Sequence, residues 1–211
     1  MPELIVAARP VADSDGSWRH YEPLVLDRPL AAALSAFVDY GYHGATIREI
    51  AQRAGLSVPG VYHHYPSKQH LLVELFNRSM TDLLQRSRSA RAAGQVPAQR
   101  FALLVECLVL YHTYRKELAS IGASEMRGLE EPDRSRVVAY RNEQQRMLDE
   151  EAVEACRLGM FTTTRPREAA RAVATMCTSL PQWYKADGPR TPEEIAAEYV
   201  DFSLSLIKFV S

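Results

Sequence analysis

Apolar residues recur at intervals of three and four along most of this chain, the spacing that places them on one face of an α-helix. The first such stretch follows Asp27, a good N-cap, and runs to Gly41, which can end a helix in a left-handed conformation. Thr46-Ile47-Arg48-Glu49 is a capping-box sequence and predicts a short second helix ending at Gly55. Ser57 can cap a third helix at once, so the pair predicts a helix-turn-helix.

The rest of the chain repeats the helical period. Ser67 is expected to cap a longer helix that ends near Arg88, and Gly94 and Pro97 mark the next break. Further amphipathic stretches cover 101–112, 137–158 and 169–185, with a kink at Pro181, and a last helix opens with a capping box at Thr191. Because no stretch shows the period-2 alternation of a strand, the expected fold class is all-α.

The pattern also predicts domain organisation. Residues 1–26 have three prolines and no sustained period, which is typical of an irregular N-terminal arm outside the core. We expect a helix-turn-helix domain over 27–72 and a larger helical domain over 73–211.

Composition places the chain among ordinary globular proteins. It has 211 residues, 46% hydrophobic and 24% charged, which is enough to bury a core. No apolar run approaches the roughly 20 residues of a membrane-spanning helix, and the N-terminus lacks the pattern of a secretory signal. We therefore expect a cytoplasmic protein with no membrane partner. The three cysteines have no CxxC spacing, which gives little support to a disulfide framework or a metal site.

Catalytic motifs are scarce in the sequence. Ser205-Leu206-Ile207-Lys208 fits an SxxK pattern, but its partner motifs are missing and Leu206 is wanted for packing. P-loop, GxGxxG, GxSxG and HExxH motifs are absent as well. We predict no enzymatic activity, no catalytic residues and no cofactor.

The stretch from Thr46 to Lys68, TIREIAQRAGLSVPGVYHHYPSK, resembles the DNA-binding signature of the TetR family of transcriptional regulators. This resemblance implies a homodimeric, ligand-responsive regulator, most often a repressor, that binds a palindromic double-stranded DNA operator. Segments 140–146 and 182–196 are similar to a branch that regulates lipid and steroid catabolism, several of whose members sense acyl-CoA thioesters. The alternative is a protein of this fold that binds a ligand or a partner and has weak or lost DNA binding.

The third short helix should enter the DNA, because a major groove about 12 Å wide admits one helix. Its first residues, Val58, Pro59 and Gly60, are small and mostly apolar, so they can touch thymine methyl groups only. Arg48 is the best candidate for direct readout, since its guanidinium suits guanine O6 and N7. The other expected DNA-binding residues, as phosphate ligands or caps, are Thr46, Ser57, Tyr62, His63 and Lys68. Thr46 as a cap alone and Tyr62 as a packing residue alone are the alternatives.

A dimer interface is expected on the last two helices, where small residues permit close approach and large ones supply apolar area. The residues are Ala170, Ala174, Thr178, Tyr199, Phe202, Leu206 and Phe209. The alternative is that both helices serve only the core of the monomer.

An effector pocket is expected where larger or polar-tipped side chains interrupt apolar faces. The candidates are Leu104, Leu108, Tyr111, His112, Met126, Tyr140, Met147, Met176 and Trp183. The mixture favours a small, largely apolar effector, with an acyl-CoA as the minority alternative. For each of these residues, the alternative is packing in the core without ligand contact. The fourth helix is the expected lever between effector and DNA.

The net charge is −1, and neither half of the chain has a marked excess of basic or acidic residues. Residues 1–90 hold 9 Lys and Arg against 9 Asp and Glu, and residues 91–211 hold 16 against 17. A DNA-binding half without basic excess predicts few phosphate contacts and a shallow salt dependence of DNA affinity.

Overall fold

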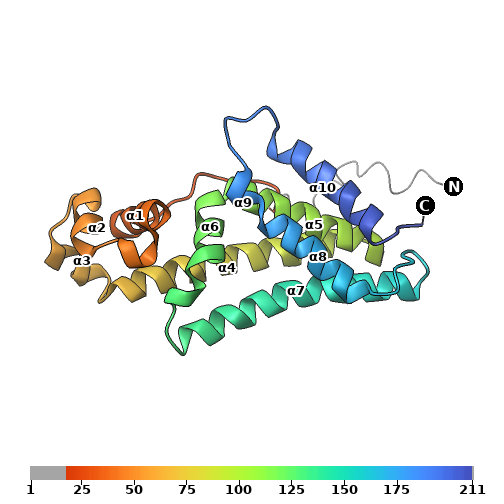
Figure 1. Cartoon of the computed structure of the whole chain (residues 1–211), viewed down its shortest axis with the longest axis horizontal. Helices are drawn as coiled ribbons and strands as arrows, with labels where there is room; N and C mark the ends of the chain where they lie inside the picture. The colour runs from red at the N-terminus through yellow and green to blue at the C-terminus, as the bar shows by residue number, and fades with distance from the viewer. Residues whose placement is uncertain (1–17, 211) are drawn as a thin grey trace. The chain divides into compact units, whose positions relative to one another are not determined.

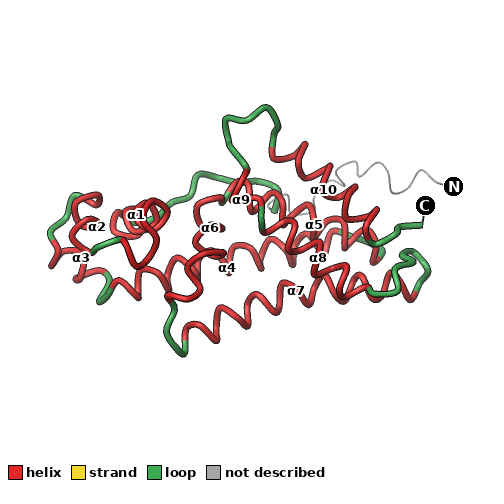
Figure 2. The backbone as a smooth tube through the Cα atoms, in the orientation of Figure 1, coloured by secondary structure: helices red, strands yellow, loops and turns green. Residues whose placement is uncertain are grey.

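The computed structural model describes residues 18–210, which form helices joined by loops and turns, as Figures 1 and 2 show. The prediction of an all-α fold is confirmed; an isolated bridge between Phe161 and Phe209 is the one strand-like contact within 18–210. The helices are α1 (Arg28–Gly44), α2 (Ile47–Ala54), α3 (Val58–His64), α4 (Lys68–Ala93), α5 (Pro97–Tyr114), α6 (Lys116–Ser124), the short 3₁₀ helix η1 (Glu125–Gly128), α7 (Asp133–Arg157), α8 (Pro166–Thr178), α9 (Leu180–Trp183) and α10 (Pro192–Leu206).

The described chain divides into two compact units. The helix-turn-helix unit comprises Glu22–Asp82 and Arg115–Tyr140, and the bundle unit comprises 18–21, 83–114 and 141–210. The division differs from a single cut near residue 72, because α6, η1 and the start of α7 group with α1 rather than with the later helices. The long helices α4 and α7 each run from one unit into the other.

Side-chain caps form at the starts of α1, α2, α3, α4 and α10. Side-chain oxygens of Asp27, Ser57 and Ser67 accept from backbone N–H groups three residues ahead, at 3.0, 3.1 and 3.1 Å. Each bond satisfies a donor that has no partner inside its helix, which is worth about 1 kcal/mol. At Thr191 both halves of the capping box form. These predicted starts are confirmed.

The second predicted capping box is only half formed. Thr46 accepts from Glu49 N–H at 3.2 Å, but the Glu49 carboxylate does not return to the Thr46 backbone. It pairs instead with Arg53, one turn further along α2, at 3.0 Å. The i,i+4 ion pair therefore competes with the cap, and Arg53 is also held by Asp39 at 2.6 Å.

Helix α1 is broken where a glycine was expected to end it. Gly41 has φ 71° and ψ 165°, a backbone conformation that side chains with a Cβ rarely adopt. The chain then re-forms a turn up to Gly44, so the helical segment extends slightly beyond the predicted end.

The hydrophobic pattern did not predict α6 and η1, which lie against α1 within the helix-turn-helix unit. Leu118 and Ile121 of α6 and Leu129 after η1 are buried. The Glu125 carboxylate accepts from the Tyr42 N–H at 3.1 Å, which ties this segment to the end of α1. Gly128 permits close approach, because a Cβ there would lie 2.8 Å from the Tyr42 ring.

Helix α5 forms the centre of the bundle unit and packs against α8 and α10. It is apolar on nearly every side, and residues such as Phe101, Leu104 and Leu108 have almost no exposure. A helix hydrophobic all round is one that neighbours must surround, and this is what the bundle provides. Pro181 does more than kink the predicted helix, since α8 and α9 are separate elements that meet at Ser179.

The N-terminal arm needs correction over its described part. Residues 1–17 lie outside the described residues, but Trp18 is only 3% exposed and belongs to the core of the bundle unit. Arg19 makes a two-bond ion pair with Glu106 at 2.5 and 2.9 Å, and Arg86 donates to the carbonyls of Trp18 and His20. These partners lie more than 60 residues away in sequence, so the local pattern could not reveal them.

Candidate functional site

The turn between α2 and α3 has the geometry of a helix-turn-helix. Gly55 adopts φ 64° and ψ 37°, the left-handed conformation that lets the chain leave α2 sharply. The amide of Leu56 then donates back to the carbonyl of Ala51 at 2.9 Å, and Ser57 caps α3. The tight turn therefore follows from residues that the sequence analysis identified.

Helix α3 packs through one side and presents the other. Val61 is fully buried, facing a core that includes Ile50 and Ala54 of α2. The predicted DNA-binding residues fall on the accessible side: Thr46, Arg48, Ser57, Pro59, Tyr62 and His63 are exposed, and Val58, Gly60 and Lys68 are half-buried. The structure thus leaves this set accessible while its neighbours form the core.

The basic residues of this unit differ in how they are bound. Arg48 is exposed and makes no hydrogen bond or ion pair with any described residue. Arg28 donates to the Gly55 carbonyl at 3.2 Å, and Arg53 is held between Asp39 and Glu49. Arg48 is the cation of α2 that is available to a ligand.

Lys68 has a structural role that the sequence analysis did not include. Its ammonium donates to the carbonyls of Tyr42 and Ala45 at 2.7 and 2.9 Å and lies 4.4 Å from the Tyr42 ring centroid. Partial burial lowers the pKa of this ammonium. Lys68 therefore closes the end of α1 onto the start of α4.

Tyr65 is a second residue that the sequence analysis missed. It follows α3 directly, and its hydroxyl donates to the Asp27 carboxylate at 2.6 Å. Burial, together with this carboxylate, raises the pKa of Tyr65, so the hydroxyl keeps its proton. Asp27 thereby joins the start of α1 to the end of α3.

An exposed apolar surface lies on α9 and α10 of the bundle unit. Trp183, Phe202 and Leu206 keep 44%, 55% and 45% of their surface, and the Trp183 and Tyr199 rings stack at 6.5 Å. We call Trp183, Phe202 and Leu206 the α9–α10 patch. Large apolar side chains this close together on a surface favour a protein contact.

Several predicted interface residues serve the monomer instead. Ala170 is fully buried and Tyr199 nearly so, which leaves them little area for a partner. Phe209 packs edge-on against Phe161 at 6.2 Å. Ala174 and Thr178 are half-buried and stay accessible in part.

The predicted effector residues are divided between the two units and differ in burial. Leu104, Leu108, Tyr111, His112 and Met147 are buried in the bundle unit, and Met176 of the same unit is half-buried. Met126 and Tyr140 belong to the helix-turn-helix unit, and Trp183 lies on the surface within the α9–α10 patch. The sequence pattern could not separate these sets, because all interrupt apolar helix faces in the same way.

His112 is a buried polar group of the bundle unit. Its Nδ1 lies 2.7 Å from the Leu108 carbonyl, which can only accept, so the proton is on Nδ1 and Nε2 is left as an acceptor. Burial lowers the pKa of His112 to about 4, and the charge of Arg141 acts in the same direction. His112 is therefore neutral at physiological pH.

Gln144 of α7 is another buried polar group, and it is only 7% exposed. Neither its amide nitrogen nor its amide oxygen has a hydrogen-bond partner. An unsatisfied buried amide is costly, and a bound molecule that both donates and accepts would remove the cost.

The described part of the chain offers no metal cluster and no membrane-spanning helix. Between residues 18 and 210, no three His, Cys, Asp or Glu side chains gather in a way that could hold a metal ion. Over the same residues, every helix falls short of the length and apolar character that crossing a bilayer requires.

Comparison with known families matches both parts of the chain. Residues 30–75 match the model described as bacterial regulatory proteins, tetR family. Residues 94–207 match the model described as tetracyclin repressor-like, C-terminal domain. The second match alone covers more than half of the chain.

Individual relatives are similar over different lengths. The transcriptional activator FasR of Mycolicibacterium smegmatis is 40% identical over 77 residues, which is 36% of this chain and 35% of that protein. The transcriptional repressor KstR2 of the same organism is 24% identical over 176 residues, 82% of this chain and 86% of that one. The structure of AibR in complex with isovaleryl coenzyme A and operator DNA superimposes with a TM-score of 0.76 at 25% identity, over 86% of this chain and 97% of that one.

Stability should fall in mild acid because of His112. The unfolded side chain takes up its proton near pH 6.5, whereas the folded one does so only near pH 4. Between these values the unfolded state binds more protons, so the free energy of unfolding decreases as the pH falls, by about 2 kcal/mol from pH 7.5 to pH 5. Urea unfolding at fixed protein concentration across this range measures the effect.

Two variants test how much of the pH dependence of the free energy of unfolding comes from His112. His112→Gln should flatten the pH dependence, while Thr113→Val, which alters a buried neighbour that does not titrate, should lower stability and keep the slope. Equal slopes in the parent and His112→Gln would contradict the assignment.

Proposed function

Because this chain belongs to the TetR family of bacterial regulatory proteins and is therefore a ligand-responsive DNA-binding transcriptional regulator, we propose that it is a repressor. It binds a palindromic operator as a homodimer and leaves the DNA when a small, largely apolar effector binds. It acts in the cytoplasm and has no catalytic role.

The helix-turn-helix carries this proposal. Helix α3 is capped, packed through Val61 and accessible along its other side, which is the arrangement needed to enter a major groove. Arg48 supplies the guanidinium for direct readout of a guanine. The other residues assigned to DNA are Thr46, Ser57, Val58, Pro59, Gly60, Tyr62, His63 and, through its partly used ammonium, Lys68.

A dimer follows from the small footprint of one reading helix. Two copies on paired half-sites bind far more tightly than one copy, because the second contact becomes intramolecular. The α9–α10 patch supplies the exposed apolar surface for this contact, and Ala174 and Thr178 of α8 are also accessible in part. Of the predicted interface residues, we therefore assign to the dimer contact those that the monomer leaves accessible.

The buried polar groups of the bundle unit support an effector that is apolar with a few hydrogen-bonding atoms. His112 Nε2 can accept one hydrogen bond, and the Gln144 amide can both donate and accept. Leu104, Leu108 and Met147 contribute apolar surface in the same unit. An acyl-CoA is the second candidate, favoured by the acyl-CoA bound to AibR, whose fold this chain shares.

Release of DNA requires that the effector bind the DNA-incompetent state better than the competent one. Helix α4 connects the two units without a break, as the sequence analysis expected of a lever. Within the helix-turn-helix unit, the α6–η1 segment is joined to α1, since Glu125 is bonded to Tyr42 at the end of α1. An effector that shifts the start of α6 would act on α1 through this bond.

The operator can be found by selecting bound fragments from genomic DNA. We expect the recovered fragments to share an inverted repeat and to include the region upstream of the gene itself. Failure to enrich any sequence would favour the alternative, a protein of this fold with weak or lost DNA binding.

Arg48→Ala should weaken operator binding by about 1 to 3 kcal/mol and relax the preference at one base pair of each half-site. Binding to a scrambled operator should be unchanged, and so should the slope of affinity against salt. Arg78→Ala serves as control, since Arg78 lies in the same unit and pairs with Glu74. Equal losses on both DNAs, with a slope shallower by about one, would identify Arg48 as a phosphate ligand.

Phe202→Glu should convert the dimer to a monomer, because it places a charge in the middle of the α9–α10 patch. Operator affinity should fall by about 100-fold or more with the loss of the second half-site contact. Light scattering gives the mass and fluorescence anisotropy gives the affinity. Val153→Glu on α7, at a position 37% exposed, is the matched control and should stay dimeric. A dimeric Phe202→Glu protein would contradict the proposed interface.

A further inference from the structure

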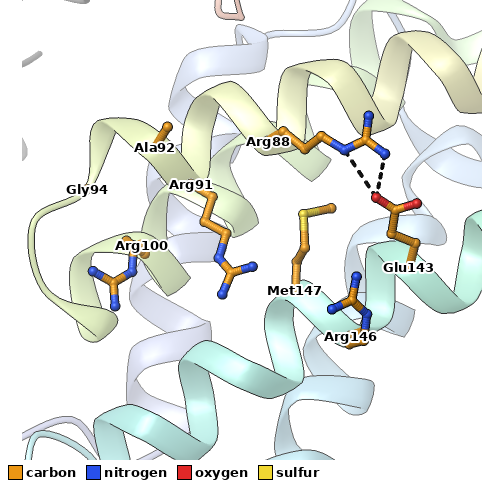
Figure 3. Close-up of a pocket in the computed structure, with 8 residues that line it drawn as sticks. All are labelled: Arg88, Arg91, Ala92, Gly94, Arg100, Glu143, Arg146 and Met147. Atoms are coloured by element: carbon orange, nitrogen blue, oxygen red, sulfur yellow. Dashed lines mark hydrogen bonds and ion pairs between the residues drawn. The ribbon is translucent and has the colours of Figure 1, made fainter.

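A charged cavity lies in the bundle unit. It has a volume of about 430 Å³ and is formed by the end of α4, the turn to α5 and the middle of α7. Figure 3 shows the eight lining residues: Arg88, Arg91, Ala92, Gly94, Arg100, Glu143, Arg146 and Met147. The volume is within the range of small-molecule sites, about 300 to 1,000 Å³.

Positive charge predominates around this cavity. Four arginines line it, and three carboxylates bond to them, those of Glu143, Glu150 and Glu151. Four positive and three negative charges leave a net charge of +1, whereas the whole chain has a net charge of −1. The cavity is therefore locally basic although the whole chain is close to neutral.

Two of the arginines are fixed from behind by a buried acid. Glu151 is 2% exposed, and its two oxygens accept from Arg91 Nε at 2.6 Å and Arg100 Nε at 2.8 Å. Gly94 lets the α4–α5 turn close on Arg100, because a Cβ there would lie 2.5 Å from its Cγ. A guanidinium has five N–H donors, so each arginine held in this way keeps donors for a ligand.

The exposed acids show that the guanidiniums converge. The Glu150 carboxylate is within 3.0 Å of Arg91 and 2.8 Å of Arg146, so one anionic group already binds two arginines there. Arg88 donates twice to Glu143, through Nε and Nη2. Glu143 and Glu150 are partly exposed to solvent. An incoming anion can therefore take over their arginine donors, because water can solvate the carboxylates that lose them.

We propose that this cavity binds the phosphate groups of a small phosphorylated molecule. A phosphate offers more acceptor oxygens and more negative charge than a carboxylate, so it can bind several converging guanidiniums at once. Ala92 and Met147 supply the apolar wall beside the charged groups. The site is independent of the operator, so its test needs no DNA.

The test is calorimetric titration of the full chain with inorganic pyrophosphate, at constant ionic strength and without DNA. We expect saturable binding that weakens at least 10-fold in Arg146→Ala. Arg157→Ala is the matched control, since Arg157 also lies on α7, is 66% exposed against 61% for Arg146, and pairs with one glutamate. It should change the affinity by less than about 2-fold.

The acidic partners provide the opposite test. Glu150→Gln should strengthen binding at least 3-fold by freeing Arg91 and Arg146, whereas Glu154→Gln, equally exposed and paired with Arg157, should not. A parallel titration with ADP distinguishes an organic phosphate from a free inorganic one. Tighter binding of ADP than of pyrophosphate would indicate an organic phosphate. No saturable binding, or equal losses in Arg146→Ala and Arg157→Ala, would overturn the proposal and show an adventitious ion only.

Discussion

The reading helix α3 has only seven residues, too few to be stable without help, and the DNA-binding surface depends on what holds it. Ser57 caps its start, Val61 packs it onto the core and the Tyr65 hydroxyl fixes its end to Asp27. Asp27 uses its other oxygen to cap α1. One carboxylate thus sets the start of the first helix and the end of the third, and the geometry of the reading surface follows from that bond.

Most basic side chains of the helix-turn-helix unit that surround α2 are likewise used to hold the fold. Arg28, Arg53 and Lys68 satisfy carbonyls and carboxylates of their own unit, which leaves Arg48 as the uncommitted cation of α2. Basic groups used in this way stabilise the fold and contribute little to counterion release on DNA. The near-neutral charge count of residues 1–90 therefore has a structural counterpart, and affinity must come from paired half-sites.

Features that depend on neighbouring residues could be predicted from the sequence, and features that depend on distant ones could not. The caps at Asp27, Ser57, Ser67 and Thr191 are local, and they form as expected. The bond from Tyr65 to Asp27 and the burial of Trp18 join residues far apart, and no local pattern indicates them. At Glu49 two local rules compete, and an ion pair with Arg53 wins over the cap.

The connections between the units constrain how an effector can act on DNA. The chain passes between them four times, and two of these passages lie inside the unbroken helices α4 and α7. A continuous helix cannot absorb a displacement as a loop can, because each residue is bonded to those a turn away. Helices α4 and α7 are therefore continuous stretches of backbone that belong to both units. Inside the helix-turn-helix unit, the bond from the Tyr42 N–H to the Glu125 carboxylate joins the α6–η1 segment to α1. A shift of that segment would therefore act on the first helix of the DNA-binding unit.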